Sequence, residues 1–155
     1  MKTTITYLEM TSSADLVPGR PAPITMEPAA PSVTRDLTCR IGVQYQWKSA
    51  SWTDDQWAAY LNGPHHSWVL RLTEDIGLAR YAIDGDDVEI TTFGLLREWT
   101  GRGVGGHALT LVLRKAWELL PDARRVWLHT STLDHPNALP NYRARGLRPY
   151  RTAEA

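Results

Sequence analysis

The sequence has little cysteine, no excess charge of either sign and no long apolar run, and each lack excludes a class of protein. The single cysteine, Cys39, rules out an intramolecular disulfide and a multi-cysteine metal site. The 17 basic and 17 acidic residues cancel, whereas a general nucleic-acid binder normally carries a basic excess. No run approaches membrane-spanning length, and the N-terminus has no apolar signal segment. We therefore expect a cytoplasmic protein that binds neither nucleic acid nor membrane.

The apolar content, by contrast, is sufficient for one hydrophobic core. The chain has 155 residues, of which 43% are hydrophobic, and this favours a single domain over residues 1–155. The sequence shows no internal repeat and no linker between two cores. Seven tryptophans stand against one phenylalanine, and three of them fall within residues 47–57.

Residue patterns predict a mixed α/β domain around a central sheet. The Pro-rich segment 17–31 contains too much proline for a helix or a central strand, so it is expected to be a surface loop or an ordered lid. A Ser/Thr cap is expected before the first helix and Thr53 before the second, while His65 and His66 are expected in a loop. The predicted strands are 3–10, 67–72, 76–83, 88–96, 125–132 and 147–152. The predicted helices are 32–42, 52–63, the stretch from the glycines near 101–106 to Pro121, and a short helix within 134–146.

Four glycines within six residues, 101–106, lie between a predicted strand and the long helix. The backbone N–H groups of such a turn can face one anion, the helix dipole favours negative charge there, and glycine lets the backbone approach closely. A P-loop is excluded because no Gly-Lys-Ser/Thr follows, and a dinucleotide fingerprint is disfavoured by the preceding β-meander. The glycines therefore predict a bound phosphate.

Two motifs give this chain a family resemblance. The strand, turn and helix resemble motif A (Q/R-x-x-G-x-G/A) of the GNAT superfamily of acyl-CoA-dependent N-acyltransferases, read from Thr100 to Gly105. The stretch ALPNYRARGL resembles motif B through Ala138, Tyr142 and Gly146. The element order also matches, and it implies a mixed sheet flanked by helices and splayed at the acyl-CoA site.

The resemblance further implies acetyl-CoA as cosubstrate, with its pyrophosphate in the glycine turn and its pantetheine arm beside the preceding strand. Thr100 departs from the usual Gln or Arg, so Arg102 or backbone amides would supply the contact. His135 stands at the usual motif B asparagine, and either His135 or Asn137 would replace it. The expected coenzyme A contacts are Phe93, Gly94, Leu95, Leu96, Thr100, Gly101, Arg102, Gly103, Val104, Gly105, Gly106, His107, His135 and Asn137.

N-acylation by direct attack needs a base for the amine and an acid for the leaving thiolate, but no covalent intermediate. By resemblance, Glu89 is the base candidate, and enclosure in a cleft would raise its pKa. Strand periodicity places Glu89 on the same face as Phe93 unless a bulge intervenes. The alternatives are a solvated Glu89 with His129 as the base, or a His129 that is only a hydrogen-bonded core residue. Tyr142 is the acid candidate by resemblance, and its alternative role is packing of the last helix on the sheet.

The acceptor is expected beside the aromatic segment 43–60. Tyr45, Trp47, Trp52 and Trp57 would give the groove an apolar or cation-binding wall, although ordinary helix–sheet packing explains at least half of these aromatics. A small-molecule amine is the expected acceptor, with a protein or peptide amine, or a non-catalytic acyl-CoA-binding domain, as alternatives. No metal is expected because the histidines lack a third well-spaced ligand. A homodimer is compatible with exposed strands and tryptophans.

Overall fold

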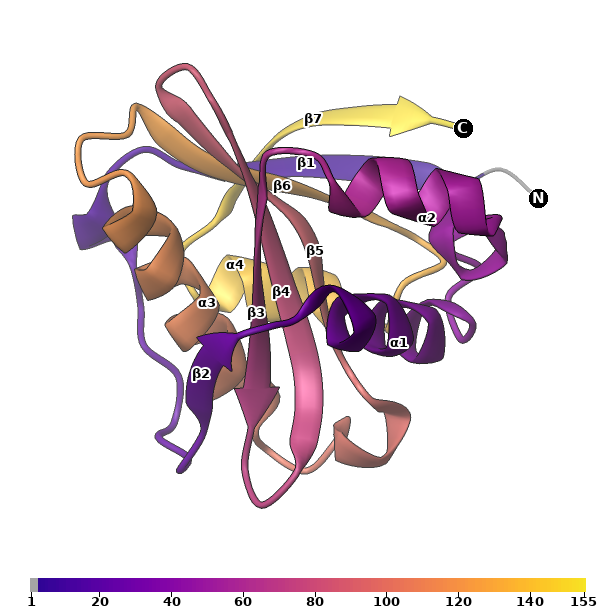
Figure 1. Cartoon of the computed structure of the whole chain (residues 1–155). Coiled ribbons are helices and arrows are strands. Elements are labelled where there is room, and N and C mark those ends of the chain that lie inside the picture. Colours follow the sequence, from indigo (N-terminus) through magenta and orange to yellow (C-terminus); the bar gives the residue numbers. More distant parts are fainter. Residues whose placement is uncertain (1–2) are drawn as a thin grey trace.

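A central sheet brings together strands that are far apart in the sequence (Figure 1). The computed structural model describes residues 3–155, and over this range it has one seven-stranded sheet with the order β2-β3-β4-β5-β6-β1-β7. All neighbouring strands are antiparallel except β5 and β6, which are parallel, and this confirms the mixed central sheet. The strands are β1 (Thr4–Met10), β2 (Thr25–Pro28), β3 (His65–Arg71), β4 (Asp75–Asp84), β5 (Asp87–Leu95), β6 (Arg125–Ser131) and β7 (Arg148–Glu154).

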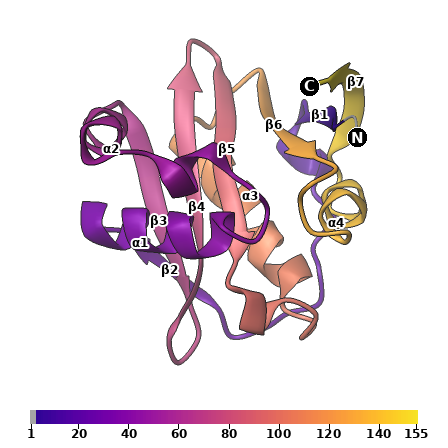
Figure 2. The ribbon, with the colours of Figure 1, turned by 90° about the vertical axis from the view of Figure 1, so that its right-hand side faces the viewer.

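The parallel strands β5 and β6 separate soon after they begin. Their pairing ends at Glu89 and Trp127, although the strands continue to Leu95 and Ser131. Figure 2 shows the two strands diverging, with α4 (Ala138–Ala144) beside the opening. The backbone groups of β5 that face this opening have no strand partner, and a ligand can therefore take their hydrogen bonds. The splay expected from the family resemblance is thus present.

Helices cover both faces of the sheet (Figure 2). α1 (Pro31–Gly42) and α2 (Asp54–Leu61) lie on one face, and α3 (Gly105–Leu119) lies on the other. Three short 3-10 helices complete the described chain: η1 (Ser13–Asp15), η2 (Lys48–Ser51) and η3 (Arg97–Trp99). No helix within residues 3–155 is both long and apolar enough to cross a bilayer.

Each face of the sheet has its own apolar core. α3 buries Leu109 and Leu113 against the larger core, as their helical spacing predicts. α1 buries Leu37 and Ile41 against the smaller core on the opposite face. The sheet is therefore held rigidly on both sides of β4 and β5, while the end of β5 is free to line a site.

Most helices and strands were predicted correctly from the sequence, but the strand within the Pro-rich segment was not. This segment contains the edge strand β2, and Pro28 is accommodated because an edge strand needs hydrogen bonds on only one side. The expected Ser/Thr cap of α1 is wrong: Ala30 is the N-cap and makes no side-chain bond, while Pro31 at the first helical position presets the backbone. Thr53 does cap α2, in a capping box with Gln56.

His65 and His66 lie in β3 rather than in a loop. They pair with Ala82 and Tyr81 near the C-terminal end of β4. The Pro and Gly before these histidines suggested a loop. Because β4 is long, however, its pairing with β3 continues beyond the apolar residues of β3 to His65. Propensity near the end of a strand was overridden by pairing with a longer neighbour.

A β-bulge in β5 decides which way its side chains point. Tyr81 pairs with Ile90 and Arg80 pairs with Thr92, so Thr91 is the extra residue. The Thr91 hydroxyl donates to the Arg80 carbonyl at 3.1 Å. Because of this bulge, Glu89 does not share a face with Phe93, which packs against the α3 core. The simple alternation expected for β5 is therefore broken at the position where the strand leaves β6.

Candidate active site

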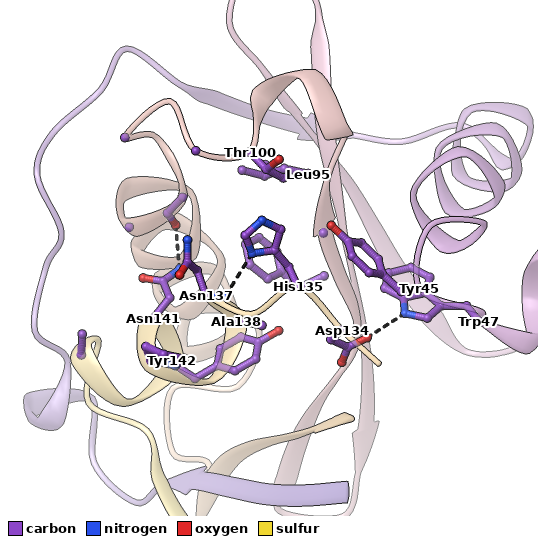
Figure 3. A pocket seen from close by; sticks show the side chains of 18 residues that line it. Tyr45, Trp47, Leu95, Thr100, Asp134, His135, Asn137, Ala138, Asn141 and Tyr142 are labelled. Carbon is purple, nitrogen blue, oxygen red and sulfur yellow. Dashed lines mark hydrogen bonds between the residues drawn. The ribbon is translucent and has the colours of Figure 1, made fainter. Parts of the chain in front are cut away.

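A cavity of about 440 Å³ opens where β5 and β6 diverge (Figure 3). Its wall combines the end of β5, the glycine turn, the start of α3, and α4 with the loop before it. The predicted site residues that line it are Tyr45, Trp47, Phe93, Gly94, Leu95, Thr100, Gly101, Gly103, Gly105, Gly106, His135, Asn137 and Tyr142. The lining residues that sequence reasoning missed are Asp134, Ala138, Pro140, Asn141 and Ala144. Contact of any of them with a ligand stays a prediction.

The glycine turn is shaped so that its backbone faces open space. Gly101 and Gly103 have φ values of +74° and +78°, in the left-handed region that side chains disfavour. A Cβ at either position would meet no atom within 4 Å. Crowding by neighbouring groups therefore does not explain these glycines, whereas the left-handed backbone does, and the open space beside the turn leaves room for a ligand.

The start of α3 presents hydrogen-bond donors to the same space. Its first intrahelical bond runs from the Ala108 N–H to the Val104 carbonyl at 2.9 Å, and Val104 makes no side-chain cap. The N–H groups of Gly105, Gly106 and His107 therefore lack acceptors within the helix. Free donors and the positive end of the helix dipole fit an anionic group such as the coenzyme A pyrophosphate.

α4 is fixed to the first turn of α3. The Asn141 amide donates to the Gly105 carbonyl at 3.1 Å. Asn137 is the N-cap of α4, and its N–H donates to the His135 Nδ1 at 3.0 Å. Pro140 falls in the first turn of α4, as expected, where its missing N–H has no intrahelical role. The two helices therefore form a continuous wall on one side of the cavity.

Tyr142 of α4 lies in this wall, and the residue is 7% exposed. Its ring lies edge-on to Phe93, with 6.4 Å between ring centroids. Burial raises the pKa of the Tyr142 hydroxyl above its ordinary value, and the Asp134 carboxylate raises it further. The phenol consequently stays neutral over the physiological pH range and remains a hydrogen-bond donor.

Several predicted contacts lie outside the cavity lining. Leu96 is 4% exposed and belongs to the smaller core, against which α1 packs. The Arg102 guanidinium lies 5.0 Å from the Trp99 ring centroid. Val104 and His107 belong to the glycine turn and the first turn of α3, but their side chains do not line the wall. Arg102 therefore does not line this cavity, and its contact with coenzyme A stays a prediction.

Trp52 and Trp57 form a separate aromatic cluster with Tyr60. The Trp52 ring centroid lies 5.1 Å from that of Trp57 and 4.9 Å from that of Tyr60. Trp57 is only 1% exposed, so any influence on an acceptor would be indirect. Trp52 and Trp57 do not line the cavity, whereas Tyr45 and Trp47 do, so contact of Trp52 or Trp57 with an acceptor stays a prediction.

Glu89 lies at the last paired position of β5 before the strands diverge. Burial raises the pKa of its carboxyl, while His129 opposes the shift and Asp84 adds to it. His129 is exposed on β6, and its ring centroid is 5.5 Å from that of Tyr7. Neither residue lines the cavity described above. Across residues 3–155 no group of three or more His, Cys, Asp and Glu side chains is arranged to hold a metal ion.

Comparison with known proteins identifies the family. The chain matches the Acetyltransferase (GNAT) family over residues 33–147, which is more than half of its length, and it belongs to this family. A GCN5-related N-acetyltransferase from Sphaerobacter thermophilus has a TM-score of 0.71 and 18% identity, covering 97% of this chain and 49% of that one. A GCN5-related N-acetyltransferase from Kribbella flavida has a TM-score of 0.69 and 21% identity, covering 97% of this chain and 56% of that one.

At these identities the two solved structures establish the shared fold alone. This chain spans about half of their length. No curated protein sequence is significantly similar to it. The donor, the acceptor and the catalytic residues must therefore be argued from the site.

Proposed function

We propose that the protein transfers an acetyl group from acetyl-CoA to the primary amine of a small molecule, by direct attack while both substrates are bound. The observation that carries this proposal is the glycine turn at the start of α3, which opens into the cavity between the diverging strands. Membership of the GNAT family supports the same reaction class. Acetyl-CoA would supply the activated acyl group, and the residues of the chain would bind it and move protons.

The donor would be held mainly by backbone groups. The turn around Gly101 and Gly103 and the free N–H groups at the start of α3 would receive the pyrophosphate. The unpaired edge of β5 from Phe93 to Leu95 would hydrogen-bond the amide groups of the pantetheine arm. Because these contacts would be made by the backbone, Thr100 could stand where the family prefers a longer polar side chain.

Two protons must move during the transfer. Glu89, or its neighbour His129, would accept a proton from the attacking amine. Tyr142 would donate its phenolic proton as the thioester C–S bond breaks, so that the thiol leaves neutral. Solvent then returns a proton to the Tyr142 phenolate and removes one from the base, which completes the proton balance.

The pH profile distinguishes the two base candidates. A carboxylate acts as a base only when deprotonated, so with Glu89 as base kcat/KM should fall as pH drops through its raised pKa. We expect Glu89→Gln to lower kcat/KM about tenfold at neutral pH and to remove this acidic limb, with solvent taking up the amine proton in place of the carboxylate. The measurement is kcat/KM between about pH 5 and 9 for the wild type, Glu89→Gln and His129→Gln. An acidic limb that persists in Glu89→Gln and disappears only in His129→Gln would reassign the base to His129.

The reaction itself is tested by thiol release from acetyl-CoA across a panel of primary amines. The expected result is thiol release that depends on a small amine, with the acetylated amine identified by mass spectrometry. Labelled acetyl-CoA incubated with proteins and peptides forms the second arm. Labelling of a protein amine with no turnover of any small amine would contradict the acceptor class. Binding of acetyl-CoA without turnover in either arm would contradict the enzymatic proposal.

A further inference from the structure

The Trp47 indole closes the cavity on the side away from the start of α3. In Figure 3, Asn141, which bonds the first turn of α3, lies on one side of the cavity, and Trp47 with Asp134 lies on the other. Phosphate groups bound at the glycine turn would therefore direct the rest of the donor toward Tyr142, Asp134 and Trp47. The reactive end of the donor would lie on the Trp47 side.

Three separate elements fix the position of this indole. A Cβ at Gly42, the last residue of α1, would lie 2.9 Å from Trp47 Cε3, and one at Gly94 of β5 would lie 3.3 Å from Trp47 Cη2. The indole Nε1 donates to Asp134 Oδ1 at 3.0 Å. The ring thus spans from α1, across the end of β5, to the loop after β6. It has little freedom to move aside when a larger group enters.

Asp134 is itself held in place on the far side of the opening. Its Oδ2 accepts from the Thr130 hydroxyl at 2.7 Å and from the Ser131 N–H at 2.9 Å. The Trp47–Asp134 hydrogen bond therefore ties the α1 side of the molecule to the end of β6. β5 and β6 are not paired beyond Glu89 and Trp127, and this hydrogen bond closes one side of the resulting opening.

Backbone strain directly precedes the indole. Gln46 has φ +57°, and within residues 3–155 it is the only non-glycine residue with positive φ. Such a conformation is unfavourable for a residue with a side chain and persists only where the surrounding structure fixes it. The Trp47 N–H bonds the Gly42 carbonyl at 3.1 Å, so the strained turn folds back onto the end of α1 and aims the indole at the cavity.

We propose that Trp47 limits the length of the acyl chain that the site accepts, so that the donor carries a short acyl group such as acetyl or propionyl. This inference rests on the proposed function, because it takes an acyl-CoA as the donor. A chain of two or three carbons ends before the indole, whereas a medium-length chain must displace a ring held by Gly42, Gly94 and Asp134. Gly94 has no side chain, so loss of the indole would open space directly beyond the end of the cavity.

Equilibrium binding tests this without any knowledge of the acceptor, because no transfer occurs without one. Dissociation constants for coenzyme A, acetyl-CoA, butyryl-CoA and octanoyl-CoA are measured by calorimetry for the wild type, Trp47→Ala and Trp47→Leu. We expect the wild type to bind octanoyl-CoA at least about tenfold more weakly than acetyl-CoA, as steric exclusion of several methylenes implies. Both variants should reduce this ratio, mainly by strengthening octanoyl-CoA binding.

Trp68→Ala is the matched control, because Trp68 is a partly buried tryptophan beneath Lys115 on the α3 face, outside the cavity. It should leave the chain-length ratio unchanged, and the melting temperature of each variant reports its folding. If the wild type binds octanoyl-CoA as tightly as acetyl-CoA, the proposal is overturned without recourse to any variant. It is equally overturned if folded Trp47 variants keep the wild-type ratio. Absence of binding to every coenzyme A ester would instead contradict the proposed function.

Discussion

Gly103→Glu is expected to weaken acetyl-CoA binding by about 100-fold or more. A carboxylate in this turn would face the pyrophosphate, and like charges about 4 Å apart near a protein surface repel by about 4 kcal/mol. Without screening this is about a thousandfold in affinity, and salt reduces it to about 100-fold. Calorimetric titration with acetyl-CoA gives the dissociation constant directly.

Gly85→Glu provides an unusually close control. Gly85 lies in the tight turn between β4 and β5, has φ +60°, and like Gly103 has no atom within 4 Å of an added Cβ. The same substitution therefore imposes the same backbone penalty away from the cavity, and acetyl-CoA affinity should be retained. Gly103→Ala adds the strain without the charge and should fall between the two. Normal acetyl-CoA binding by a folded Gly103→Glu protein would remove the glycine turn from the phosphate site.

Tyr142→Phe should lower kcat by about 100-fold and leave the acetyl-CoA dissociation constant nearly unchanged, since a positioned acid commonly contributes about 100-fold or more. The substitution removes one hydroxyl and keeps the ring that packs against Phe93. Steady-state thiol release with an identified amine gives kcat, and calorimetry gives the affinity. A fall in kcat with unchanged affinity indicates a general acid, whereas a residue that only shapes the cavity would change the affinity as well.

Tyr81→Phe is the control for loss of a buried phenol. The Tyr81 hydroxyl donates to the Val112 carbonyl at 2.7 Å within the α3 core, outside the cavity. This variant should lose stability but retain kcat. Equal turnover of wild type and Tyr142→Phe with the same amine would leave Tyr142 with a packing role alone.

Local patterns in the sequence predicted most of the elements and a glycine turn before α3. The turn can be recognised within a short stretch, because closely spaced glycines follow a strand and precede an apolar helix in the sequence. The parts that were missed depend on tertiary structure. Asp134 becomes a cavity residue through its bond to Trp47, which is 87 positions away, and Asn141 through its bond to Gly105, 36 positions away. The residue pattern within one segment cannot predict a contact with another segment so far away in the sequence.

The tryptophan-rich segment 47–57 likewise shows that the sequence alone does not reveal which side chains reach the cavity. Trp47 and Trp57 are both tryptophans and are close in sequence, yet Trp47 lines the cavity while Trp57, a residue of α2, is 1% exposed. The difference arises from the strained turn at Gln46 and from packing on glycines in α1 and β5. Likewise the bulge at Thr91, which separates the faces of Glu89 and Phe93, follows from the register with β4 rather than from the composition of β5.

The place of β1 in the sheet has a consequence for synthesis of the chain. β1 lies between β6 and β7, so Ile5 pairs with Ser131 on one side and Ala153 on the other. On the ribosome β1 emerges before the other strands of this sheet, whereas its partners β6 and β7 emerge after them. Contacts of such long sequence separation form slowly, and an apolar strand waiting for them is exposed to association with other chains. Among the strands of this sheet, the one that is synthesised first is therefore among the last to be paired on both sides.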